Sequence, residues 1–161
     1  MISRIDAHHH FWKFDAAQYG WIGPDQHVLR KDFLPSDFEP ELSAAGISGT
    51  IAVQARQSLE ETRWLLALAD EHPFIRGVAG WAPLIEANAA ANLERLAAHP
   101  KLRAIRHVLH DEADDFYILR EDFNRGVAEL KRFDLAYDIL IFERHLPQTI
   151  EFVDRHPNQI F

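Results

Sequence analysis

Short hydrophobic runs alternate along the chain with longer segments in which apolar residues recur at helical spacing. The runs are rich in β-branched and aromatic residues, which favour strands. They predict strands over residues 5–11, 49–55, 75–81, 102–109 and 135–142. Strands that alternate with helices are typical of parallel βαβ units, so the pattern predicts an α/β fold built on a parallel sheet.

The helical segments between these runs carry recognisable start and stop signals. Ser58 is followed three residues later by Glu61, the pattern of a capping box in which each side chain bonds the other residue's backbone N–H. This box predicts the start of a helix that continues through Ala69. Further helices are predicted near residues 36–45, 88–98, 122–133 and 146–155, and Gly46 is placed to end the first of them.

A His-Pro dipeptide follows a helical segment three times, at His72, His99 and His156. Proline cannot continue a helix and histidine suits a helix C-terminus, so these histidines have a structural explanation. The first two dipeptides precede a strand, and the third therefore announces a sixth strand. A complete barrel of eight strands takes about 250 residues, so the 161 residues are expected to supply five βα units and the start of strand six.

Composition is that of one globular domain, with 47% hydrophobic and 26% charged residues. The formal net charge of -8 disfavours nucleic acids and anionic membranes as partners. No apolar run approaches the ~20 residues that a membrane span requires, and the first residues show no export signal. The chain has no cysteine, which excludes disulfides and thiolate zinc sites. We expect a protein of the cytoplasm, a reducing compartment.

The segment Asp6-Ala-His-His-His-Phe-Trp12 is the most informative for chemistry. Strand alternation places His8 and His10 on one face and His9 on the other. Two neutral imidazoles on one face can bind one metal ion, and a catalytic zinc needs further ligands besides. An expression tag is disfavoured, because only three histidines occur and they lie within a strand. From spacing alone, packed or surface histidines explain the pattern equally well.

This segment is one of several ordered motifs, the others being Tyr19-Gly-Trp21, Val53-Gln-Ala55, Glu61-Thr-Arg-Trp64, Arg76-Gly-Val-Ala-Gly-Trp81 and Ile105-Arg-His107. Together they resemble the amidohydrolase superfamily, in the amidohydrolase-related group of TIM-barrel hydrolases that includes sugar lactonases of the L-fuconolactonase type. The resemblance runs over essentially the whole chain.

The resemblance implies a distorted (β/α)8 TIM barrel of the metal-dependent hydrolase type, with residues 1–161 as the N-terminal part of a single domain. It implies that His8 and His10 are metal ligands at the C-terminal mouth of the barrel, where active sites of this fold lie. A divalent metal is expected, with zinc favoured, although some relatives need none. A later histidine and a last-strand aspartate usually complete such sites, so the catalytic base is expected beyond Phe161.

The ends of the later strands supply substrate-binding candidates, because catalytic and substrate groups gather there in this fold. These candidates are Gln54, Trp81, Arg106, His107 and Asp138. A guanidinium at Arg106 can hold a carboxylate or lactone oxygen in bidentate geometry, although a surface arginine paired with an acid is equally compatible. Arg106 and His107 must face opposite ways on a regular strand, so one of the two is expected to pack.

The sequence therefore predicts a hydrolase that opens a small cyclic ester, a sugar lactone, with water activated by a metal or by a carboxylate base. A decarboxylase or amide hydrolase of the same fold is the alternative, and a catalytically silent binding domain is another, since fold does not imply function. The expected partner is a small-molecule substrate, and a homo-oligomer is compatible with the sequence. Residues 1–161 alone are expected to be inactive.

Overall fold

The computed structural model describes residues 4–161, in which five parallel strands form one sheet in sequential order. The strands are β1 (Ile5–His9), β2 (Gly49–Val53), β3 (Ile75–Gly80), β4 (Leu102–Val108) and β5 (Ala136–Leu140). Each pairs in parallel with the next along the chain. All five predicted strands are present, and each ends within two residues of its predicted end.

One α-helix follows each strand, as the sequence predicts. The helices are α1 (Pro35–Ala44), α2 (Leu59–Glu71), α3 (Ala89–Ala97), α4 (Glu121–Leu130) and α5 (Leu146–Arg155). Gly46 has a φ of 65°, a left-handed conformation that suits glycine and ends α1 as expected. The short 3-10 turns, such as Pro24–Leu29 in the loop after β1, are not predicted from the sequence.

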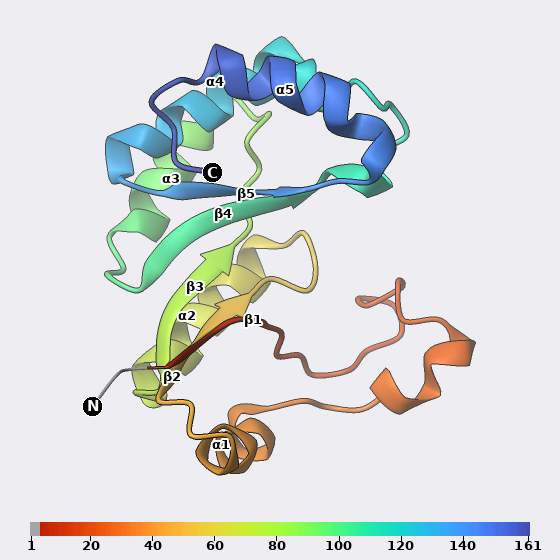
Figure 1. The fold of residues 1–161 in the computed structure, drawn as a ribbon, viewed down its shortest axis with the longest axis vertical. Coiled ribbons are helices and arrows are strands. Elements are labelled where there is room, and N and C mark those ends of the chain that lie inside the picture. The colour runs from red at the N-terminus through yellow and green to blue at the C-terminus, as the bar shows by residue number, and fades with distance from the viewer. Residues whose placement is uncertain (1–3) are drawn as a thin grey trace.

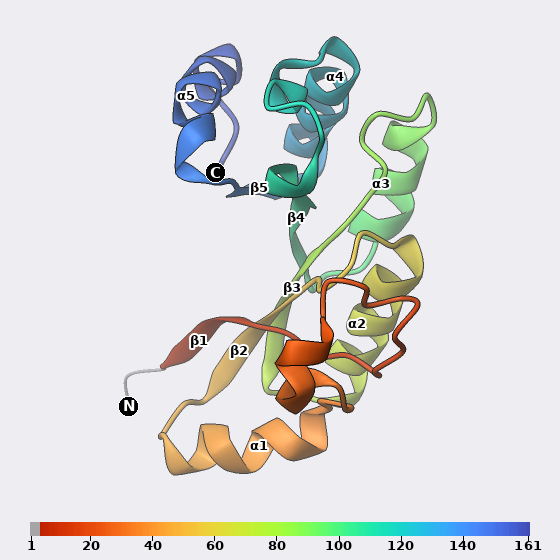
Figure 2. The same ribbon diagram turned by 90° about the vertical axis from the view of Figure 1, so that its right-hand side faces the viewer.

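The sheet is strongly curved, and the helices lie along its outer side (Figures 1 and 2). In the view of Figure 2, α2 and α3 cover the middle of the sheet, α4 and α5 cover the β5 end, and α1 lies at the β1 end. The inner face of the curve carries no helix in the part of the chain that the structure describes. This arrangement is part of a TIM barrel, confirming the predicted fold class.

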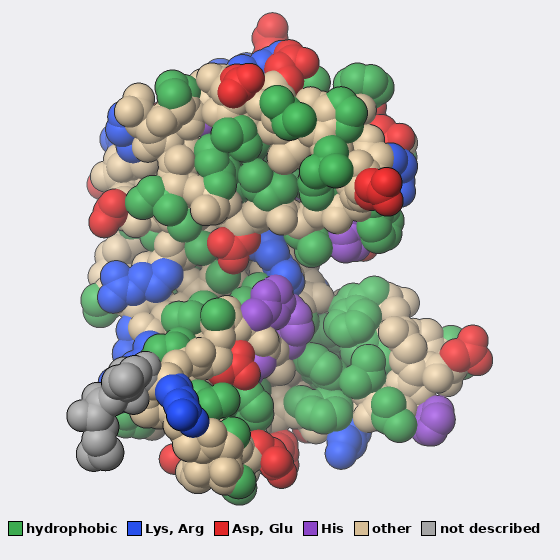
Figure 3. Space-filling view, in the orientation of Figure 1, with side chains coloured by type: hydrophobic (Ala, Val, Ile, Leu, Met, Phe, Trp, Pro, Cys, Tyr) green, Lys and Arg blue, Asp and Glu red, His purple; other side chains and the backbone are tan. Residues whose placement is uncertain are grey.

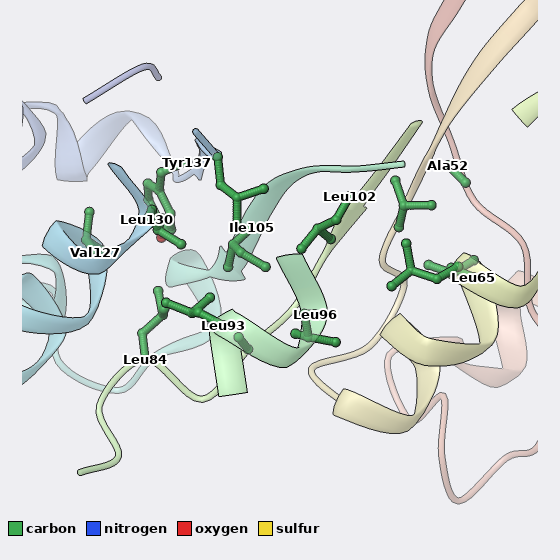
Figure 4. Packing of buried hydrophobic residues seen from close by; sticks show 14 of the residues in the cluster. Ala52, Leu65, Leu84, Leu93, Leu96, Leu102, Ile105, Val127, Leu130 and Tyr137 are labelled. Carbon is green, nitrogen blue, oxygen red and sulfur yellow. The ribbon is translucent and has the colours of Figure 1, made fainter. Parts of the chain in front are cut away.

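The two faces of the sheet carry different sets of side chains. The outer face carries Ala52, Val78, Ile105 and Tyr137, which are buried against residues of the helices such as Leu65. Figure 4 shows Ala52, Ile105 and Tyr137 in this packing. The inner face instead carries a small cluster of its own, made of Val53, Ala79 and Ala104. The main core therefore lies between sheet and helices, and small side chains leave room on the inner face.

The two outermost strands differ in what lies beside them. Beside β5, the segment that follows α5 returns to the sheet, where the backbone N–H of Tyr137 donates to the oxygen of Ile160 at 2.9 Å. This hydrogen bond fits the expected start of a sixth strand. On its other side, β1 has no strand neighbour within residues 4–161. None of the helices in these residues is long and apolar enough to cross a membrane.

The N-terminus of α2 departs in one respect from its predicted capping box. The Ser58 hydroxyl accepts hydrogen bonds from the backbone N–H groups of Glu60 and Glu61, at 3.1 and 3.3 Å, as an N-cap should. The reciprocal half of the box is wrong, because the Glu61 carboxylate accepts instead from the N–H groups of Ala55 and Arg56. The loop after β2 folds back over the helix start and offers these two donors to the carboxylate.

Candidate functional site

His8 and His10 converge on the inner face of the sheet, as alternation along the strand predicts. Their Nε2 atoms are 3.2 Å apart. His9 points to the other side, where its ring stacks on Phe38 at 4.6 Å and its Nδ1 lies 2.6 Å from the Thr50 hydroxyl. The strand separates the three histidines into a facing pair and one packed ring, and the role of the pair as ligands stays a prediction.

The protonation of His10 follows from its hydrogen bond. Its Nδ1 lies 2.9 Å from the backbone oxygen of Val53, and a carbonyl oxygen only accepts, so Nδ1 carries the proton. The Nε2 atom of His10 therefore presents a lone pair toward His8. Burial lowers the pKa of His10 to about 4, and burial also lowers the pKa of His8. Both rings are thus neutral near pH 7, which is the form that binds metals.

The spacing of these two nitrogens fits a shared metal ion. Two ligands at 2.0–2.1 Å from a tetrahedral zinc lie about 3.3 Å from each other, and the two Nε2 atoms are 3.2 Å apart. No group of three or more His, Cys, Asp or Glu side chains suited to a metal occurs within the described residues. The spacing of His8 and His10 is thus compatible with two positions of a zinc site, and their role as ligands stays a prediction.

Arg106 and Gln54 form hydrogen bonds with each other at the ends of β4 and β2. The Arg106 Nη2 atom donates to the backbone oxygen of Gln54 at 2.5 Å and to its Oε1 at 3.2 Å. The Gln54 amide donates in return to the Arg106 backbone oxygen at 3.4 Å. The other terminal nitrogen, Nη1, lies 3.4 Å from Nε2 of His8. Because the sheet curves, a β4 side chain thereby meets a β1 side chain across the inner face.

Asp138 completes the polar group on the inner face. It is the register partner of Arg106 on the neighbouring strand. Burial raises the pKa of its carboxyl, and the charge of Arg106 opposes that shift. A cavity of about 370 Å³ is lined by His8, Arg106 and Asp138 together with Ile139, Leu140 and Phe161. Figure 3 shows histidine, basic and acidic side chains gathered beside a hollow in the middle of this face.

Trp81 and His107 lie apart from this cavity and contact each other. The indole N–H of Trp81 donates to Nδ1 of His107 at 3.2 Å, and Nε2 of His107 lies 2.6 Å from the Glu112 carboxylate. The His107 ring stacks on Tyr117 at 5.2 Å. Of the adjacent pair on β4, Arg106 therefore faces the cavity and His107 packs, as the alternation predicts. The structure brings together five of the seven predicted site residues and leaves these two aside.

Two residues near the site were not singled out from the sequence as site residues, namely Tyr19 and Glu61. The Glu61 side chain is buried, and its Oε1 accepts a hydrogen bond from the Tyr19 hydroxyl at 3.0 Å. Burial raises the pKa of both groups. The sequence pattern around Glu61 predicts the start of a helix and therefore a capping role for this residue. That pattern gives no indication of its contact with the loop after β2.

Comparison with known proteins finds similar sequences and structures that match nearly the whole of the chain. The sequence profile of the amidohydrolase family matches residues 5–161. An L-fucono-1,5-lactonase from Burkholderia multivorans is 45% identical over 156 residues, covering 95% of this chain and 52% of that protein. A crystal structure of a Burkholderia multivorans amidohydrolase with bound HEPES superimposes with a TM-score of 0.91 at 43% identity, covering 96% of this chain and 54% of that chain.

A second crystal structure of a Burkholderia multivorans amidohydrolase, with bound zinc, has a TM-score of 0.90 at 44% identity and covers 96% of this chain and 55% of that chain. The chain thus spans about half the length of the relatives it matches.

Proposed function

This chain belongs to the amidohydrolase family, and from that premise we propose that the full-length protein opens a small cyclic ester, a sugar lactone, by hydrolysis. The observation that carries the proposal is the 45% identity to an L-fucono-1,5-lactonase across 95% of the chain. Since the chain spans only about half of that relative, we take residues 1–161 as the N-terminal part of a single barrel domain. The enzyme is the full-length protein.

We propose that His8 and His10 hold a divalent metal ion, with zinc favoured. Their spacing and the lone pair that His10 presents support this role, and a related amidohydrolase has been crystallised with zinc. When bound, the ion would supply Lewis-acid chemistry that makes hydroxide available near neutral pH. The general base and the remaining ligands are expected in the part of the full-length protein that follows Phe161.

The residues around the cavity suit the other needs of the reaction. Attack of water on a lactone carbonyl places negative charge on the carbonyl oxygen, and the Arg106 guanidinium is a cation at the cavity that can stabilise that charge. Gln54 fixes the position of the guanidinium through the hydrogen bonds to its Nη2 atom. The Asp138 carboxylate can accept hydrogen bonds from sugar hydroxyls. Trp81 and His107 lie outside the cavity, so a substrate contact from either stays a prediction.

The test compares the full-length protein with its His8→Ala, His10→Ala double variant. We expect the variant to lose bound zinc and to hydrolyse sugar lactones at a rate lower by roughly 100-fold or more, since loss even of outer-shell partners costs 10–100-fold. His99→Ala is the matched control, because His99 contacts the exposed Asp70 away from the cavity. Elemental analysis and release of the ring-opened acid are measured.

Equal zinc content and equal lactone hydrolysis in the double variant and the control would refute the ligand role. Product analysis also separates the rival functions. Carbon dioxide release would indicate a decarboxylase, amide cleavage would indicate an amide hydrolase, and binding without turnover would indicate a silent domain. The cytoplasmic location and any homo-oligomer stay predictions.

A further inference from the structure

One buried carboxylate joins the two loops that follow β1 and β2, outside the cavity that His8, Arg106 and Asp138 line. Glu61 lies in the first turn of α2, and the residue is 1% exposed. Its Oε2 atom accepts from the backbone N–H groups of Ala55 and Arg56, both at 2.9 Å, and its Oε1 atom accepts from the Tyr19 hydroxyl at 3.0 Å. Each carboxylate oxygen is thus committed to a different loop.

We propose that Glu61 is a positioning residue, which holds the peptide between Gln54 and Ala55 and through it the guanidinium of Arg106. This inference rests on the proposed function, in which Arg106 stabilises the negative charge of the reaction. Glu61 itself does not touch the cavity that His8, Arg106 and Asp138 line.

The geometry of one peptide unit carries the inference. The oxygen of Gln54 and the N–H of Ala55 belong to the same planar group, so they cannot rotate independently. That oxygen accepts from Nη2 of Arg106 at 2.5 Å, and that N–H donates to Oε2 of Glu61 at 2.9 Å. Any rotation that frees the N–H from Glu61 therefore also withdraws the oxygen from Arg106.

The rest of the surroundings leaves this peptide few other supports. On the side of the sheet, the Gln54 N–H donates to the Ala79 oxygen at 2.8 Å, which fixes the preceding peptide. On the side of the solvent, the Trp21 indole N–H donates to the Ala55 oxygen at 2.9 Å, and the Trp21 side chain is exposed. The buried carboxylate is the one partner that binds the Ala55 N–H directly.

Position 61 needs a side chain that accepts hydrogen bonds. Three donors point at its two oxygens, and Nε of Arg56 lies 4.0 Å from Oε1. A glutamine can still satisfy these donors, because its oxygen can accept from the two backbone N–H groups while its amide donates to the Tyr19 hydroxyl, which also accepts. A methionine has a similar length but at most a weak acceptor, so Glu61→Met leaves the backbone N–H groups of Ala55 and Arg56 without their partner.

The test uses the full-length protein and the variant Glu61→Met, with Glu60→Met as the matched control. Glu60 lies in the same helical turn and carries the same charge, but its side chain is 81% exposed. We expect Glu61→Met to lower kcat and kcat/KM together by about tenfold, because a misplaced transition-state group affects both, and misplacement of about 1 Å can cost 100-fold. The control should stay within twofold of the unaltered protein.

A double-mutant cycle separates positioning from a general loss of stability. If Glu61 acts through the Arg106 guanidinium, then Glu61→Met should have less than a twofold effect in an Arg106→Ala background. Independent effects of the two changes, which multiply, would overturn the proposal. Should Glu61→Met fail to fold, Tyr19→Phe removes one donor while keeping the ring, and the same cycle and the same criterion apply to it.

The Trp21 indole N–H gives a readout that needs no activity. It binds the Ala55 oxygen, so its NMR resonance, assigned with Trp21→Phe, reports on the loop after β2. We expect this resonance to shift in Glu61→Met and to stay unchanged in Glu60→Met. An unmoved resonance would overturn the positioning role even in an active enzyme. A full-length protein with the expected shift but no lactone hydrolysis would overturn the proposed function alone.

Discussion

His107 is a packed side chain whose two ring nitrogens both have partners. Its Nδ1 accepts from the Trp81 indole, so Nε2 carries the proton and donates to Glu112. The ring is therefore neutral with one defined tautomer. Burial lowers the pKa of His107, and the hydrogen bond and charge of Glu112 oppose that shift. A histidine held in this way links the ends of β3 and β4 to the loop that follows β4.

The lowered pKa of His107 predicts a loss of stability in acid. The unfolded chain binds a proton at this position near pH 6.5, whereas the folded chain binds it only at a lower pH. Stability therefore falls as the pH drops below about 6.5, by at most about 1.4 kcal/mol per pH unit for one group. We expect His107→Gln to lessen the loss of stability between pH 7 and pH 5, measured by urea unfolding of the full-length protein.

Other histidines contribute to the acid sensitivity of the whole protein, so a control is needed. His27 is exposed in the loop after β1, and His27→Gln should leave the pH dependence as it is. Equal pH dependence in both variants would contradict the prediction.

At the scale of elements, α4 approaches the loop after β3 closely because of one glycine. Glycine usually weakens a helix by about 1 kcal/mol relative to alanine. Gly126 lies on the buried face of α4, and a Cβ atom added there would meet the backbone oxygen of Leu84 at 2.1 Å. The added Cβ atom would meet backbone atoms of Leu84, so no flexible side chain could move aside to relieve the overlap. The glycine is thus required for the packing of α4.

Gly126→Ala is expected to destabilise the full-length protein by about 1–3 kcal/mol, because the overlap outweighs the gain in helix propensity. Gly20→Ala is the control, since a Cβ atom there meets nothing within 4 Å. Its effect on the free energy of unfolding should stay within about 0.5 kcal/mol. Thermal and urea unfolding measure both, and a neutral or stabilising Gly126→Ala would show that the helix can shift without cost.

At the scale of the whole molecule, the described residues form an open curve of five strands. The outer side of the sheet is covered by helices, while the inner side carries no helix within residues 4–161. Apolar side chains beside the two outermost strands are exposed, among them Ile5 at 45% and Phe161 at 40%. Parallel sheets are normally covered on both faces, and a barrel removes its edges by closing. Exposed strand edges recruit other chains.

Residues 1–161 expressed alone are therefore expected to self-associate and to lack lactone hydrolysis. Light scattering after size exclusion, beside the full-length protein, measures the association, and a lactone assay measures the activity. The full-length protein should show a defined mass and be active. A monomeric segment of 161 residues that melts cooperatively with full activity would refute the barrel assignment and the function built on it.

The sequence by itself determined the order and type of the elements, because periodicity and caps are local properties. Alternation along β1 predicted that His8 and His10 share a face, and alternation along β4 predicted that only one of Arg106 and His107 faces inward. Both predictions depend only on residues that are close together in the sequence. The motifs likewise predicted the amidohydrolase family that the comparison shows.

Only the tertiary structure decided which distant groups meet. The contact between Arg106 and His8 spans 98 positions, and the contact between Arg106 and Gln54 spans 52. Such meetings depend on strand register and on the curvature of the sheet, which no local pattern encodes. Glu61 has the sequence pattern of a capping residue, yet the loop after β2 brings donors that take its carboxylate instead. A side chain with several acceptable partners takes the one that the assembled fold brings within reach.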